Sequence, residues 1–163
     1  MWCGLITNWW CGLVSIGVVF LFSEMQWPRG PKETPLGRQL HREVPRGSVV
    51  TLINGASPEN IYWVAQDAVG IGANTTIQGN IFSNSAAIAV GSSCTITGRL
   101  LTKAGAISFG PGTLSLPVNP STHVDLLGVD SFIIFTCGGG VANTGASTYT
   151  GNIGTNLGAI TAF

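Results

Sequence analysis

Charge is the scarcest feature of this chain of 163 residues, since only 14 side chains are charged and the formal net charge is zero. The charged fraction of 9% is far below the roughly 25% that is usual for soluble domains. A neutral balance argues against a general nucleic-acid binder, which needs a basic surface to displace counterions. It also argues against a polybasic membrane-surface protein. Hydrophobic residues make up 45% of the chain, which is enough to build a core and excludes wholesale disorder.

Residues that carry chemistry are also few and scattered. The four cysteines fit neither a metal-ligand spacing nor a dense disulfide scaffold; they are Cys3, Cys11, Cys94 and Cys137. The only histidine after residue 46 is His123, in a proline-containing stretch that predicts an exposed loop. The carboxylates of that region do not form the acid–base pair that a polysaccharide-cleaving enzyme needs. We therefore expect no catalysis, no metal and no cofactor.

Residues 1–46 differ in composition from the rest of the chain. Residues 1–22 are apolar and rich in tryptophan, and they are long enough to be a candidate membrane span. They lack the positively charged start of a secretory signal. Three interpretations stay open for them: an export signal or membrane anchor, a misassigned start, or a structural cap. Residues 24–46 hold eight charges and four prolines, which predicts a solvated linker outside the fold.

A repeat of 19 residues organises the remainder of the chain. Gly72, Gly91 and Gly110 stand 19 positions apart. Apolar residues repeat with the same offset, in the sets Val69, Ile88, Ile107; Ile71, Val90, Phe109; Ile77, Ile96; and Ile81, Leu100. A fixed period with apolar positions in register is typical of stacked coils, and this period is too short for a helical pair. We expect three coils of a β-solenoid, each about 4.8 Å above the last, with no obvious cap at either end.

The alternation of side chains along a strand assigns each position to a face. The repeated apolar residues point inward, together with Cys94 and the glycines at 79 and 98. The outward positions of the first strand are small; they are Ala68, Gly70, Ala87, Ala89, Ala106 and Ser108. The outward positions of the second strand are polar; they are Thr76, Gln78, Asn80, Thr95, Thr97 and Arg99. The repeated glycines indicate corners that need a positive φ or a close approach of two backbones.

Several short motifs occur in a fixed order between residues 47 and 116. They are Val49-Val50-Thr51-Leu52-Ile53-Asn54-Gly55, Ile61-Tyr62-Trp63-Val64, Gly70-Ile71-Gly72, Gly79-Asn80-Ile81 and Thr97-Gly98-Arg99-Leu100-Leu101. This order resembles the second half of the microbial ice-binding (antifreeze-type) protein domain. Residues 126–163 resemble the opening strands of the same domain, through Leu127-Gly128 to Phe132, residues 143–154 and residues 158–163.

The resemblance implies a secreted or cell-surface, all-β protein that folds as a right-handed β-solenoid of triangular cross-section, with a long helix along one side. The order of its parts departs from the family, because the opening follows the end, and the region of the helix and the middle strands is absent. Two explanations stay open: a piece of a tandem-domain protein, or opening strands that pack back onto the same column, as in a circular permutation.

The expected organisation has four parts. Residues 1–46 lie outside the fold, and residues 47–117 form the solenoid. Residues 118–125 form a linker, and residues 126–163 form the segment that is similar to the opening strands.

A regular and uncharged solenoid face is suited to bind a flat lattice. Together with the resemblance, this predicts adsorption to ice through many small contacts and ordered water. Ice is then the partner, neighbouring domains of the same type are further candidates, and nucleic acid is not a partner. The alternatives are an extracellular adhesin or structural module, and an inactive fragment of a multi-domain ice-binding protein.

Two sets of short polar side chains are candidates for the ice-binding face. They are Thr76, Gln78, Thr95 and Thr97 in the repeats, and Thr144, Ser147, Thr148 and Thr150 in the tail. Threonine offers a hydroxyl and a methyl group at a stiff χ1, whereas Arg99 interrupts the first set and counts against it. The flatter face of small residues, which includes Ala89 and Ser108, stays as an alternative.

Overall fold

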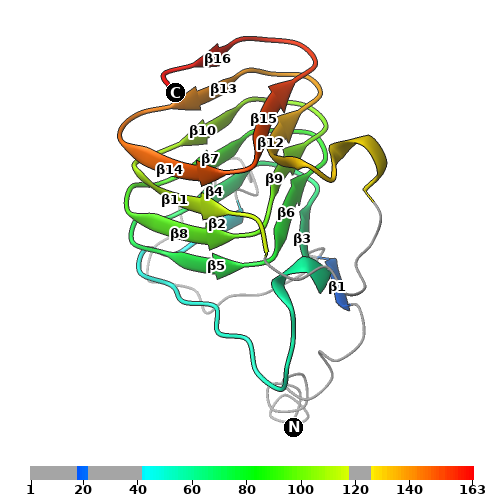
Figure 1. Ribbon diagram of the computed structural model, residues 1–163, viewed down its shortest axis with the longest axis vertical. Helices are drawn as coiled ribbons and strands as arrows, with labels where there is room; N and C mark the ends of the chain where they lie inside the picture. Colours follow the sequence, from blue (N-terminus) through cyan, green and yellow to red (C-terminus); the bar gives the residue numbers. More distant parts are fainter. Residues whose placement is uncertain (1–17, 22–41, 118–125) are drawn as a thin grey trace, which may run out of the picture.

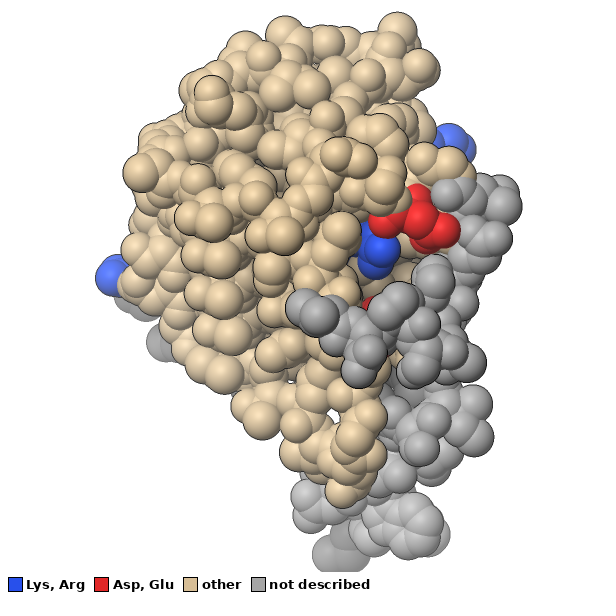
Figure 2. All heavy atoms as spheres, viewed as in Figure 1, with Lys and Arg blue, Asp and Glu red and all other residues tan. Residues whose placement is uncertain are grey.

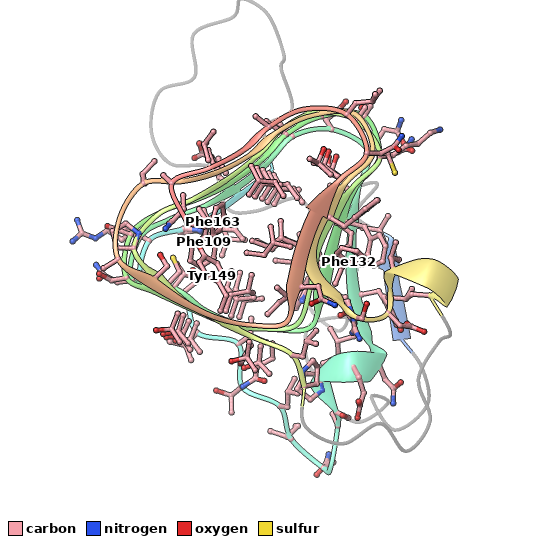
Figure 3. The ribbon with its side chains drawn as sticks, turned by 45° about the horizontal axis from the view of Figure 1, so that its top comes forward. Phe109, Phe132, Tyr149 and Phe163 are labelled. Carbon is pink, nitrogen blue, oxygen red and sulfur yellow. The ribbon has the colours of Figure 1, made fainter. Side chains whose placement is uncertain are left out.

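The computed structural model describes residues 18–21, 42–117 and 126–163. They form a column of short parallel strands whose sides are three β-sheets (Figure 1). Seen obliquely from its upper end, the column has a triangular outline, and the coils lie over one another (Figure 3). The chain climbs as it passes from sheet to sheet, in a right-handed coil with a rise of about 4.8 Å per coil of three strands. The expected all-β solenoid is confirmed.

Each side of the column is one parallel sheet. Sheet A has the order β1 (Val18–Leu21), β3 (Ile61–Ala65), β6 (Asn80–Ser83), β9 (Leu100–Thr102), β12 (Phe132–Thr136) and β15 (Asn152–Thr155). Sheet B has the order β2 (Arg42–Val44), β4 (Val69–Ile71), β7 (Ile88–Val90), β10 (Ile107–Phe109), β13 (Val141–Asn143) and β16 (Ile160–Thr161). Sheet C contains β5 (Thr76–Gln78), β8 (Cys94–Thr97), β11 (Gly112–Ser115) and β14 (Ser147–Thr150). Short 3-10 turns precede β3 and β12, at Pro58–Asn60 and Leu127–Val129.

The 19-residue repeat of the sequence corresponds to the register in which neighbouring strands pair. Ile88 lies beside Val69 in one neighbouring strand and beside Ile107 in the other, so residues 19 positions apart stack. The offset changes higher in the column. It is 34 positions between β9 and β12, where Leu100 pairs with Ile134. The additional residues of this longer coil lie between β11 and β12, and the offset returns to 19 where β13 pairs with β16.

The core is the inside of the column, and the inward assignments of the apolar repeat are confirmed. Several of these side chains are 0% exposed; they are Ile88, Ile96, Leu100, Ile107, Phe109, Leu114, Ile133 and Ile134. Cys94 is also buried, at 1% exposed, as the alternation predicts. Full burial of one such apolar side chain contributes about 1.5–3 kcal/mol, but each coil is thin and depends on the coils above and below it.

The prediction of an outward Asn80 is wrong, because Asn80 is 0% exposed. Gly79 turns the chain between β5 and β6 with a φ of 116°, so the alternation does not continue across it. The Asn80 amide donates hydrogen bonds to the carbonyl oxygens of Glu59 and Ile61, at 3.1 and 3.3 Å. Its Oδ1 accepts a hydrogen bond from Arg99 Nη1 at 3.2 Å. The polar side chain is therefore satisfied inside a corner.

Glycine is required at the corners, as predicted, because neighbouring coils touch there through their backbones. A Cβ atom on Gly91 would lie 2.7 Å from the nitrogen of Ala73. A Cβ atom on Gly98 would overlap the carbonyl oxygen of Gly79. Any side chain at these positions would push two coils apart.

A column of hydroxyl side chains closes the corner between sheets A and B. Ser83, Thr102, Thr136 and Thr155 are partners in successive strands. Thr102 donates to the carbonyl oxygen of Ala86 at 2.9 Å, and Thr136 donates to that of Gly105 at 2.8 Å. These buried hydroxyls satisfy carbonyls of the turns that no strand pairs.

Residues 1–46 differ from the expectation in two places. β1 pairs with β3 in sheet A, and β2 pairs with β4 in sheet B, so both add a parallel strand to the column. Strand pairing uses backbone groups, so a charged sequence such as Arg42–Val44 does not prevent it. The interpretations of residues 1–17 and 22–41, and the linker at 118–125, concern residues outside those that the structure describes.

Residues 126–163 continue the same column. β12 pairs with β9, β13 with β10 and β14 with β11, all in parallel. These strands therefore extend the column that the preceding coils form. At the upper end, Tyr149 packs between Phe109 and Phe163, with ring centroids 5.3 and 5.1 Å away (Figure 3). Asn143 also holds the last coil, since its amide donates to the carbonyl oxygen of Ala162 at 3.0 Å.

Candidate functional site

The outer face of sheet C carries two straight rows of polar side chains. The register of β5, β8, β11 and β14 places Thr76, Thr95, Thr113 and Thr148 in the first row. The second row contains Gln78, Thr97, Ser115 and Thr150. Neighbours within a row are one strand apart, about 4.8 Å, and the two rows are two residues apart along the strand, about 6.6 Å. The result is a regular grid of eight uncharged side chains.

The grid is rigid because it rests directly on the core. Between the two rows the inward positions are Ile77, Ile96 and Leu114, which are 3%, 0% and 0% exposed. Tyr149 continues this column in β14, and burial raises the pKa of its phenol. Most of the outward side chains are β-branched, with a restricted χ1, so their hydroxyl and methyl groups keep a fixed orientation.

The first row, which we call the threonine row, is the more accessible of the two. Thr95, Thr113 and Thr148 are exposed, and Thr76 is half-buried. In the second row only Thr150 is exposed. Within the part of the chain that the structure describes, the side-chain hydroxyls of the three exposed threonines form no hydrogen bond to protein. Those hydroxyls are therefore free to bind water or a solid surface.

Charged side chains lie at the margins of this face. Figure 2 shows sheet C toward the viewer without acidic or basic side chains over its strands. Arg99, which the alternation places beside the threonines, lies beyond the corner at Gly98 and outside β8. Its guanidinium donates to the carbonyl oxygen of Asp130 at 2.8 Å and to Asn80 Oδ1 at 3.2 Å. Arg99 therefore does not interrupt the rows.

Six of the eight candidates from the sequence lie on the grid, and two do not. Ser147 has the inward position that Gly112 and Cys94 have in the strands below, and its hydroxyl contacts Asn143 Oδ1 at 3.0 Å. Thr144 follows β13 in a turn, where its hydroxyl donates to the carbonyl oxygen of Phe109 at 3.4 Å. Both belong to the corner between sheets B and C, so the polar set that the sequence indicates in the tail lies only partly on the grid.

Sequence reasoning missed two members of the grid, Thr113 and Ser115. The offset between β8 and β11 is 18, since Thr113 pairs with Thr95, so a search at 19 positions does not find them. The alternation of Thr113, Leu114 and Ser115 is the signal that could have identified this strand.

The alternative face on sheet B is less regular in its chemistry. Its outward positions, from β2 to β16, are Glu43, Gly70, Ala89, Ser108, Ala142 and Thr161. Only two of them carry a hydroxyl group, and they are not adjacent. One edge of this face carries the carboxylate of Glu43. This face is flat, but it offers no array of polar groups.

Features of other kinds of site are few among residues 18–21, 42–117 and 126–163. No three His, Cys, Asp or Glu side chains come together there as a metal site would require. Cys94 is buried and Cys137 is exposed, and both are free thiols. No helix in this part is long and apolar enough to cross a membrane.

Comparison with known proteins gives one match. Residues 39–114 match a family model that is described as "Ice-binding-like". No curated protein and no solved structure matches the chain. The matched residues run from β2 into β11 and include five of the eight members of the grid.

Proposed function

We propose that this protein adsorbs to ice through the outer face of sheet C, a proposal that the match of residues 39–114 to the ice-binding-like family model supports. The observation that carries the proposal is the grid of eight uncharged polar side chains in two straight rows. A crystal lattice presents equivalent sites at fixed intervals, so a ligand surface with fixed intervals can engage many of them at once. Adsorbed protein would then inhibit growth or recrystallisation of the ice.

The physical basis is the sum of many weak contacts. Each threonine contributes a methyl group that orders nearby water and a hydroxyl group that binds it, so the face can carry an ordered water layer that merges with the lattice. A rigid strand face loses little conformational entropy on adsorption. A charge would hold its own hydration shell against the lattice and oppose contact. The lack of charge on sheet C therefore favours this face.

The setting of this activity is part of the same proposal. The protein acts outside the cell, secreted or at the cell surface, where it meets ice. It needs no catalysis and no cofactor, because adsorption is its whole action. Neighbouring domains of the same type would add their own grids to the contact and raise the avidity.

A pair of matched variants tests the choice of face. Thr95→Tyr places a bulky ring in the middle of the threonine row, and Ser108→Tyr places the same ring in the middle of sheet B. We expect Thr95→Tyr to abolish thermal hysteresis and crystal shaping, and Ser108→Tyr to retain both, with unchanged circular dichroism in each. The opposite pattern would assign the activity to sheet B. Absence of ice shaping in the unaltered protein would favour an adhesin or structural module instead.

A further inference from the structure

The outer face of sheet A holds an apolar cleft that the proposed function does not use. The cleft has a volume of about 600 Å³ and is lined mainly by apolar side chains. It lies across β3, β6, β9 and β12, on a different side of the column from the threonine row. Its size is within the range of about 300–1,000 Å³ that is typical of ligand and docking sites.

The floor of the cleft is a straight row of apolar residues. Val64, Phe82, Leu101 and Phe135 are partners in four successive strands. Val64, Phe82 and Phe135 are half-buried although they point away from the core. Leu126, which precedes the 3-10 turn at Leu127–Val129, and Val129 within that turn form one wall. A continuous apolar strip of this kind on a soluble protein indicates a contact surface.

Residues 1–17 have the chemistry to fill this cleft. They carry no charge, and their apolar residues stand at positions 2, 5, 6, 9, 10, 13, 14 and 16. Small or polar residues occupy positions 3, 4, 7, 8, 11, 12 and 15. The apolar positions recur about every four residues, close to the 3.6-residue period of an amphipathic helix. One side of such a segment is apolar, and it includes Trp9 and Leu13.

The position of β1 brings this segment to the cleft. β1 begins at Val18 and pairs with β3, so the chain that follows this segment enters at the edge of the same sheet whose outer face carries the cleft. The distance from β1 to β12 across the sheet is four strand spacings, about 19 Å. A helix of 17 residues would be about 25 Å long. The segment is therefore long enough to cross β3, β6, β9 and β12.

We infer that residues 1–17 dock with their apolar side in the cleft on sheet A. The contact would cover the row from Val64 to Phe135 and would make the apolar segment part of the solenoid. The inference concerns a different face from the one that we propose to bind ice, and it does not depend on that proposal.

Thiol cross-linking of the full chain tests the inference. Cys137 lines the cleft and is exposed, whereas Cys94 is buried and unreactive. Residues 1–17 contribute Cys3 and Cys11. A short bismaleimide, followed by peptide mapping of the monomeric product, should yield a link within one chain between Cys137 and Cys11 or Cys3.

Variants that introduce a charge into the cleft, with a matched control on sheet B, extend the test. Phe82→Asp should abolish the link within the chain, and Val64→Asp repeats the test at a second position. Ser108→Asp adds the same charge to the outer face of sheet B and should retain the link. Circular dichroism establishes that each variant is folded.

Three outcomes would overturn the inference. The first is the absence of a link in the unaltered chain although Cys137 reacts with a monofunctional maleimide. The second is a link that persists unchanged in folded Phe82→Asp and Val64→Asp. The third is a link that forms only between two chains, because this would make a second copy the occupant of the cleft.

Discussion

Thr95 and Thr113 are partners in neighbouring strands of sheet C, although 18 positions separate them where the repeat below has 19. The shortening lies in the turn before β11 and keeps both threonines in the outward row. The coil above is much longer, yet it returns Thr148 to the same row beside Thr113. The threonine row therefore stays straight although the coil length changes twice.

Thr113 is therefore expected to matter as much as Thr95. Thr113→Tyr should abolish thermal hysteresis, because the ring would stand above the plane of the other three threonines, through which we propose that the protein contacts ice. Thr144→Tyr is the matched control, since Thr144 is exposed but lies in the turn after β13 and off the grid. Full activity of Thr113→Tyr together with loss of activity in Thr144→Tyr would mean that the contact surface includes the corner rather than the row.

The hydroxyl column between sheets A and B predicts that removal of one buried hydroxyl lowers the stability of the protein without changing its fold. Thr136→Val keeps the volume but removes the donor to the carbonyl oxygen of Gly105, in a residue that is 0% exposed. Leaving a buried acceptor unsatisfied costs about 1–3 kcal/mol. Urea unfolding followed by circular dichroism measures this change. An unfolding free energy equal to that of the unaltered protein would show that this hydroxyl is dispensable.

Close contact between coils predicts strong position dependence for glycine substitutions. Gly98→Ala should destabilise the protein by more than about 3 kcal/mol, because the new Cβ would overlap the carbonyl oxygen of Gly79. Gly128→Ala should change stability by less than about 0.5 kcal/mol, since nothing lies within 4 Å of its added Cβ. Thermal denaturation compares the two, and equal melting temperatures would contradict the tight stacking at the Gly79–Gly98 corner.

The sequence predicts the lower part of the column well because its coils are equal in length. Isoleucine and valine at a fixed offset identify the inward positions, and the alternation then places Thr76, Thr95 and Thr97 outward. The assignment of a residue to the inner or outer face fails where a corner interrupts the alternation or where the coil length changes. Asn80 is inward because Gly79 turns the chain, and Thr113 escapes a search at 19 positions.

Other features depend on contacts that composition does not encode. β2 pairs with β4 through its backbone groups, and Val44 packs against the core, but the neighbouring charges at Arg42 and Glu43 conceal this strand in the sequence. β12 joins sheet A after a coil of 34 positions, so the 19-residue repeat does not identify it. The apolar cleft arises because Val64, Phe82 and Leu101 align on an outer face, and this alignment requires the register.

Partitioning into a slowly growing ice hemisphere tests the central proposal most directly. Thr95→Lys combined with Thr113→Lys places two charges in adjacent strands of the threonine row. Ala89→Lys combined with Ser108→Lys places the same two charges in adjacent strands of sheet B. We predict that the first double variant is excluded from the ice, whereas the second enters it as the unaltered protein does. Entry of the Thr95 and Thr113 double variant at the level of the unaltered protein would contradict binding through sheet C.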